Sequence, residues 1–112
     1  MNIEDMKLSD LLPLLKLLQH TIQLETNHPW EIGKIYLIRT VTMIDTGRLL
    51  SVTDQELVLE DAAWIADTGR FADAVEKAEF GEVEPFPKGK VIIGRGSIID
   101  AVEIKQAPRS QK

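Results

Sequence analysis

Three neighbouring segments decide the fold: KIYLIRTVTMI at residues 34–44, LLSVT at residues 49–53 and LVLEDAAWI at residues 57–65. They are rich in Ile, Leu, Val and Thr, which favour strands. The tetrapeptide DTGR at residues 45–48 predicts a turn between the first two segments, with Gly47 supplying a positive φ. Residues 53–56 predict a second turn. The sequence therefore predicts an antiparallel meander of three strands.

The second half of the chain predicts a short helix and two further strands. DTGR occurs again at residues 67–70, where Asp67 or Thr68 can cap a helix over residues 71–80 that Gly81 ends. Residues 90–93 and 97–104 predict the last two strands, and residues 82–87 a loop or short strand. The connection at residues 94–96 is too short for a crossover. We therefore expect the last two strands either to pair antiparallel or to turn a corner.

Residues 9–25 predict a helix at the start of the chain, with Pro13 in its first turn. Its leucines form two stripes. Either both stripes pack on the domain, or one of them meets another chain. We divide the chain into an N-terminal helix and linker at residues 1–30, a small barrel at 31–105 and a disordered tail at 106–112.

The predicted fold class is mainly β (α+β). We expect an N-terminal helix and a strongly bent, five-stranded antiparallel sheet that forms a small barrel, with a short helix inserted before the fourth strand. The length of 112 residues suits one domain. Short strands with regular turn signals are typical of such barrels.

Composition restricts the function. The chain has 13 basic and 18 acidic residues and a net charge of −5, which makes duplex DNA a poor partner. It has no cysteine, which excludes disulfides and thiol catalysis. Acidic residues near the N-terminus do not suit a signal peptide, and the longest apolar stretch is too short and polar to cross a membrane. We expect a cytoplasmic protein that does not bind membranes.

No constellation of catalytic residues is recognisable. His20 and His28 are eight positions apart and lack an acidic partner at metal-ligand spacing, so we expect no metal. DTG is also the loop of aspartic proteases, but the second copy here opens a helix, so local hydrogen bonding explains both copies better. We expect a protein that is not an enzyme and has no cofactor.

Several side chains are candidates for ligand binding. Arginines can contact phosphate groups, and aromatic rings can stack on a base. Gly94 and Gly96 free the backbone around Arg95, which suits an anion. Asp54 is the expected ion-pair partner of Arg95 if that arginine is structural. Each arginine can equally be a solvated surface charge, and both interpretations stay open. The candidate arginines and aromatic residues are Arg39, Arg48, Arg70, Arg95, Trp30 and Tyr36.

Alternation along residues 57–65 predicts that Trp64 lies on the outer face of its strand, where it needs a cover from the N-terminal helix or from the helix at 71–80. An uncovered Trp64 would mark an interface. The inner face would carry the side chains Leu57, Leu59, Asp61, Ala63 and Ile65.

Two parts of the chain resemble the Sm/LSm family of small β-barrels. Gly47, Asp54 and LVLEDA at residues 57–62 are similar to its first motif, and VIIGRGSII at residues 91–99 is similar to its second. The resemblance implies a homo-oligomer, in the form of a ring, with Arg95 facing the central pore as the one RNA contact carried over. HPW at 28–30, IRTVT at 38–42 and LEDAAW at 59–64 also resemble small proteins of tailed phages and prophages.

Together these observations predict a non-enzymatic homo-oligomeric binding or assembly module of phage origin. Its expected partners are copies of itself, a small phosphate-bearing ligand, or a phage or host protein. Three alternatives stay open: an anti-defence protein that sequesters a nucleotide signal, a virion component, and an RNA-binding ring.

Overall fold

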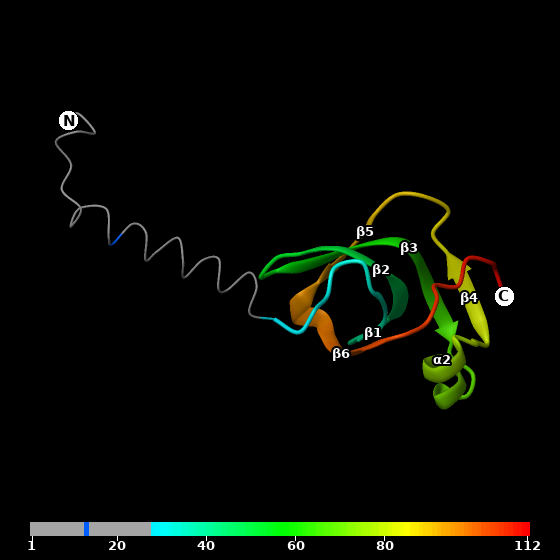
Figure 1. The fold of residues 1–112 in the computed structure, drawn as a ribbon. Helices are drawn as coiled ribbons and strands as arrows, with labels where there is room; N and C mark the ends of the chain where they lie inside the picture. The colour runs from blue at the N-terminus through cyan, green and yellow to red at the C-terminus, as the bar shows by residue number, and fades with distance from the viewer. Residues whose placement is uncertain (1–12, 14–27) are drawn as a thin grey trace.

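The computed structural model describes residues 28–112 and, before them, Pro13 alone. The helix expected over residues 9–25 therefore lies outside the described residues. The described part contains six strands, a short α-helix and a 3₁₀ turn (Figure 1). In chain order they are β1 (Ile35–Thr40), β2 (Ile44–Val52), β3 (Glu56–Asp67), α2 (Phe71–Lys77), β4 (Glu82–Pro85), β5 (Val91–Gly94), η2 (Arg95–Ser97) and β6 (Ile98–Glu103).

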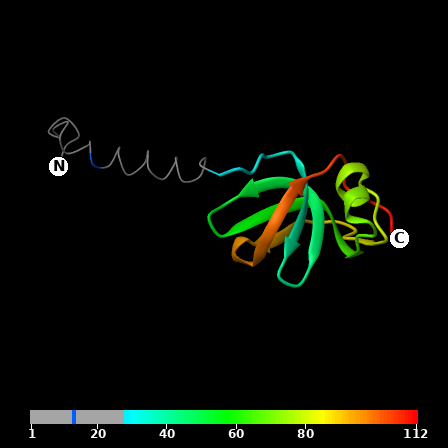
Figure 2. The ribbon, with the colours of Figure 1, turned by 90° about the horizontal axis from the view of Figure 1, so that it is seen from below.

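All strand pairs are antiparallel, and the sheet has the order β4-β3-β2-β1-β6. β5 lies beside the first half of β3, whereas β4 lies beside the second half. Figure 2 shows the strands inclined to one another, as in a strongly twisted sheet. The prediction of a mainly β, antiparallel fold is confirmed. The sheet does not close into a barrel. It has six strands and not five, because residues 82–85 form the additional strand β4.

The connection at residues 94–96 turns a corner. β5 pairs with β3, whereas β6 pairs with β1 at the opposite edge of the sheet. The 3₁₀ turn η2 joins the two edges. Of the two arrangements that the sequence left open, the corner is therefore the one the chain adopts.

The first hairpin turns earlier than predicted, and DTGR at residues 45–48 lies inside β2. Thr40 closes the turn with its hydroxyl group, which accepts a hydrogen bond from the Met43 N–H and donates one to the Met43 carbonyl, both at 3.0 Å. The Thr40 N–H also donates to that carbonyl. A threonine side chain thus makes the turn that the sequence assigned to Gly47.

Gly47 instead lies opposite a bulge in β3. Thr46 pairs with Ala63 and Arg48 pairs with Glu60, so Gly47 alone faces both Asp61 and Ala62. Asp61 has a φ of 51°, in the left-handed region, as the first residue of such a bulge often does. A Cβ on Gly47 would lie 3.0 Å from the Leu59 Cβ. Gly47 is therefore needed for its small size and not for a positive φ.

The bulge reverses the faces of β3, so the predicted inner face is wrong. One face of β3 packs into the first core cluster through Leu57, Leu59 and Ala62, and the other face packs into the second core cluster through Ala63 and Ile65. The extra residue at Asp61 shifts the alternation by one position. The first core cluster comprises Tyr36, Ile38, Leu49, Leu57, Leu59, Ala62 and Ile93. The second core cluster comprises Leu37, Ala63, Ile65, Ala74, Phe80, Val83 and Ile104.

The helix α2 packs on the second core cluster through Ala74. It ends at Lys77, where Ala78 takes a left-handed φ of 54°, and not at Gly81. Asp67 accepts a hydrogen bond from the Gly69 N–H at 2.8 Å, and the N-cap position is held by Arg70 without a side-chain cap. The predicted cap by Asp67 or Thr68 and the predicted end at Gly81 are therefore wrong.

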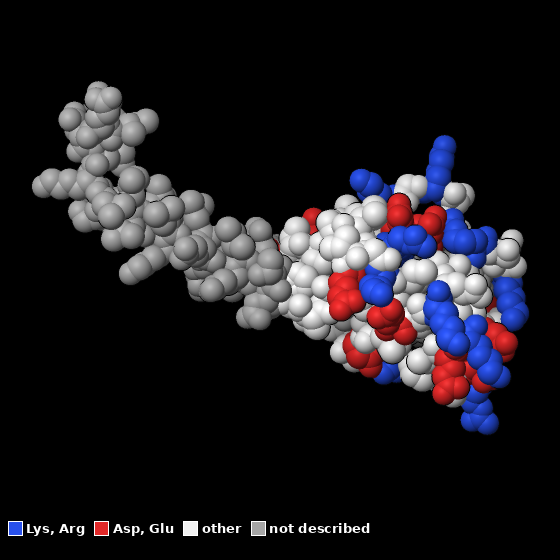
Figure 3. All heavy atoms as spheres, viewed as in Figure 1, with Lys and Arg blue, Asp and Glu red and all other residues white. Residues whose placement is uncertain are grey.

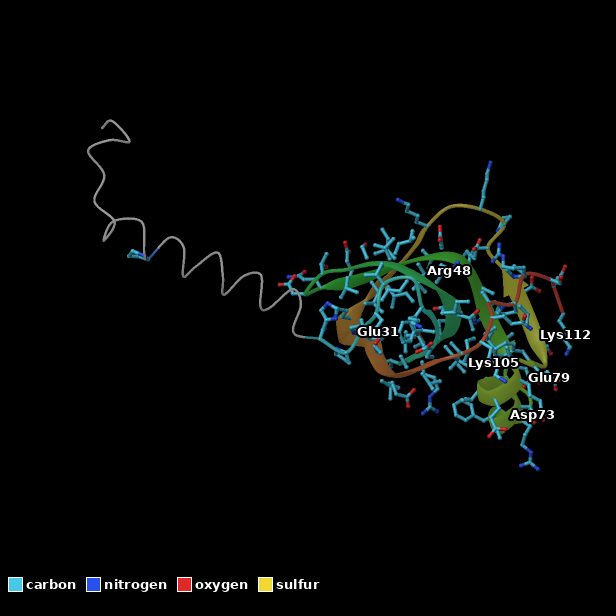
Figure 4. All side chains as sticks on the ribbon, viewed as in Figure 1. Glu31, Arg48, Asp73, Glu79, Lys105 and Lys112 are labelled. Atoms are coloured by element: carbon cyan, nitrogen blue, oxygen red, sulfur yellow. The ribbon has the colours of Figure 1, made fainter. Side chains whose placement is uncertain are left out.

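The C-terminal residues lie against the outer side of β4. The backbones of Lys112 and Val83 exchange two hydrogen bonds, of 2.9 and 3.0 Å. Arg109 donates to the carbonyls of Ala62 and Phe86, at 2.9 and 3.0 Å. Figure 4 shows Lys112 beside β4. Among the described residues, no helix is long and apolar enough to cross a membrane.

Replacing Gly47 with Ala should destabilise the fold by about 1–3 kcal/mol, because the new methyl group would press on Leu59 and on the Glu60 carbonyl. Urea unfolding measures the change. Gly94→Ala is the matched control, since nothing lies within 4 Å of a Cβ built there. Equal stabilities of the two variants would contradict the bulge packing.

Candidate functional site

Arg95 ties the corner η2 to the β2–β3 turn. Its N–H donates to the Gln55 carbonyl at 2.8 Å, and its guanidinium group donates to the Thr53 carbonyl. Asp54 lies in the same turn, yet the ion pairs of residues 28–112 do not include it. Arg95 therefore reaches the predicted turn, but it binds the backbone and not the predicted carboxylate.

The two glycines around Arg95 do not supply unusual backbone angles. Gly94 has a φ of −68°, and neither Gly94 nor Gly96 has a positive φ. Nothing lies within 4 Å of a Cβ built at either position. Gly94 and Gly96 are therefore exposed among the described residues. The expectation that the corner needs backbone angles available only to glycine is wrong.

Arg39 is held by two other elements. Its guanidinium group forms two hydrogen bonds with the Asp100 carboxylate of β6, and the Nε–Oδ1 distance is 2.7 Å. The same group lies 5.3 Å from the ring centre of Phe71 in α2. Hydrogen bonding to Arg39 lowers the pKa of Asp100 below its usual value. Arg39 thereby links β1, β6 and α2.

The two predicted stacking residues contact each other. The rings of Trp30 and Tyr36 lie 5.1 Å apart in an edge-to-face arrangement with an interplanar angle of 73°. Tyr36 belongs to the first core cluster, and its hydroxyl group accepts a hydrogen bond from the Glu31 N–H at 3.0 Å. These aromatic rings therefore stabilise the start of β1.

The remaining candidate arginines lie apart from each other. Arg48 is in β2 opposite Glu60, and its Nε is buried without a hydrogen-bond partner among the described residues (Figure 4). Arg70 is exposed just before α2. On the face that Figure 3 shows, basic side chains are mixed with acidic ones. The described residues on that face therefore do not form a single basic patch.

The structure forms a groove that the sequence did not predict. It has a volume of about 450 Å³ and lies between the β1–β2 turn, the second half of β3, and β5. Its apolar walls include Met43, Trp64, Phe86 and Ile92, all exposed. Trp64 is 40% exposed. α2 packs on the second core cluster, on the other face of β3, so α2 does not provide the predicted cover for Trp64. The other predicted cover, the N-terminal helix, lies outside the described residues.

Asp45 is the only charged side chain among the described residues that line this groove. It pairs directly with Trp64 across β2 and β3. Burial raises the pKa of Asp45 above its usual value, because partial removal of water disfavours the charged form. The ion pairs formed within residues 28–112 do not involve it. The groove therefore combines apolar walls with one half-buried acid.

The composition of this groove indicates the kind of ligand that it can bind. An apolar groove with a single carboxylate suits a hydrophobic group that carries a positive charge. Within the described part of the chain, no three acidic or histidine side chains are grouped so as to hold a metal ion. The sequence did not reveal Asp45, because it lies in a tetrapeptide typical of turns.

The chain matches no family model, no curated protein and no solved structure. The resemblances of its motifs to Sm-like barrels and to phage proteins therefore stay predictions.

Replacing Arg95 with Ala should lower the free energy of unfolding by about 1 kcal/mol, because the Thr53 carbonyl loses its bond to the guanidinium group. Arg70→Ala is the control, since the Arg70 side chain is exposed and forms no hydrogen bond or ion pair within the described region. The hydrogen bonds that Arg70 accepts from Asp73 and Ala74 use its backbone carbonyl, which the substitution leaves in place. Urea unfolding compares the two variants. An equal effect of both substitutions would show that Arg95 does not hold the corner.

Replacing Asp100 with Asn should lower the melting temperature slightly near pH 7, because the folded state prefers the ionised carboxylate beside Arg39. A lowered pKa in the folded state stabilises the protein above the ordinary Asp pKa of about 3.9. This stabilisation is lost as the pH falls through the folded value. The melting temperatures of wild type and variant should therefore converge in acid, and a constant difference would contradict the pair.

Proposed function

We propose that the protein is a non-enzymatic homo-oligomeric assembly module whose copies join through the free sheet edges of β5 and β6. The observation that carries this proposal is the pair of unpaired edges at opposite sides of one open sheet. Within the described residues, β5 has only β3 as a neighbour and β6 has only β1.

The hydrogen-bond alternation shows which backbone groups face outward. The Ile104 N–H donates to the Ile35 carbonyl, so the alternate residues Ala101 and Glu103 turn their N–H groups away from β1. The Arg95 N–H donates to the Gln55 carbonyl, so by the same alternation the backbone N–H and C=O groups of Ile92 point away from β3. Both edges thus present backbone donors and acceptors to another strand.

Exposed aliphatic side chains accompany these edges. Ile92 in β5 is 64% exposed and Ile99 in β6 is 65% exposed. The edge of β4, in contrast, is covered by Lys112. Pairing between copies would bury apolar surface together with the unpaired backbone groups, and both effects favour association.

The two edges differ in sequence, so a contact between β5 of one copy and β6 of the next is head-to-tail. Such a contact closes into a ring when the rotation between copies permits it and otherwise extends into a filament. This arrangement agrees with the ring that the Sm-like motifs imply. Roles as a virion component, as a phage anti-defence protein and as an RNA-binding ring stay predictions, as does the location in the host cytoplasm.

Replacing Ile99 with Lys should reduce the oligomer to smaller species, because the new charge would lie beside the pairing edge. Sedimentation velocity at micromolar concentration measures the size. Ile32→Lys is the matched control: Ile32 is 60% exposed and lies before β1, next to Gly33, whose N–H donates to Leu49 of β2, so its variant should keep the wild-type size. A monomeric wild-type protein would overturn the proposal.

A further inference from the structure

The groove beside Asp45 lacks a cover among residues 28–112, although its walls are apolar and Trp64, Phe86 and Ile92 are exposed there. We propose that residues 14–24 of the same chain dock in this groove and place the Lys16 ammonium group against the Asp45 carboxylate. This contact lies within one copy and does not depend on the edge pairing of β5 and β6.

The apolar character of the segment matches that of the groove. Residues 14–24 read LLKLLQHTIQL and contain five leucines and one isoleucine. Burying these side chains against Trp64 and Phe86 removes apolar surface of both partners from water, which favours the contact. Within the described structure, Trp64 and Phe86 belong to neither core cluster.

The charges of the two partners are complementary. Lys16 is the only Lys, Arg, Asp or Glu in residues 14–24, and Asp45 is the only charged lining residue of the groove in the described part. A half-buried carboxylate attracts a cation more strongly than an exposed one does, because less water screens the pair. The aliphatic stem of Lys16 can lie along the Trp64 ring while its ammonium group reaches Asp45.

The length of the chain permits the contact within one copy. The Trp30 ring lies 5.1 Å from that of Tyr36, so the described chain enters beside the first end of β1. The other end of β1, at Thr40, lines the groove. The four steps from Tyr36 to Thr40 span about 13 Å in a strand. The twelve steps from Lys16 to His28 span about 18 Å even when they are all helical, and more when they are partly extended.

The absence of cysteine from the sequence provides a direct test. In the full-length double variant Lys16→Cys/Asp45→Cys, a short bismaleimide should join the two thiols within one chain, and mass spectrometry of the digested monomer should show the linked peptides. The control is Lys16→Cys/Asp73→Cys, since Asp73 lies in α2 on the second core cluster, and it should give no link. If the Asp45 variant does not fold, Met43→Cys on the groove wall replaces it.

A double-mutant cycle tests the charge pair separately. Lys16→Glu and Asp45→Lys should each lower the melting temperature, and their combination should recover much of the loss, because it restores opposite charges. Strictly additive losses would overturn the pairing of Lys16 with Asp45. Links that form only between copies, or equally in the Asp73 control, would overturn the docking of residues 14–24 within one chain.

Discussion

The two-against-one pairing of Asp61 and Ala62 with Gly47 is the constraint on which the whole sheet depends. It shifts the alternation of side chains along β3 by one position. In this strand of 12 residues, the apolar side chains Leu57 and Leu59 of the first half are therefore buried on one face, and Ala63 and Ile65 of the second half on the other. The first half supports the core under β5, and the second half supports the core under β4 and α2. Without the bulge, Ala63 and Ile65 would compete with Leu57 and Leu59 for one face.

The same bulge also produces the groove. Because the alternation shifts at Asp61, Trp64 follows Ala62 on the face of the first core cluster instead of pointing away from it. There it lies beside Asp45, its partner across the strands, at the open end of that core. β5 forms the other wall and continues through η2 to β6 at the far edge of the sheet. The position of Trp64 in the candidate binding groove is thus a consequence of this local irregularity.

The sequence predicted the strand segments, which depend on composition and alternation. It did not predict the turn and the side-chain partners that depend on individual contacts. The strand-rich segments were predictable, because β-branched runs restrict the chain to few arrangements. The short connection after β5 excluded a crossover but left antiparallel pairing and a corner both open, and the structure has the corner. The first turn was not predictable, because the Thr40 hydroxyl group replaces the expected glycine turn. The hydrogen bonds of the Arg39 and Arg95 guanidinium groups were also hidden, since their acceptors, Asp100 and Thr53, each lie more than forty residues away along the chain.

Amide hydrogen exchange at the outer edge of β6 tests edge-to-edge assembly most directly. The N–H groups of Ala101 and Glu103 point away from β1, so a lone copy leaves them open to water, whereas pairing with β5 of another copy binds them. If the copies pair through these edges, both positions should exchange slowly at micromolar concentration and faster on dilution. Fast exchange at both positions at every concentration, with Val102 still protected by β1, would contradict this pairing.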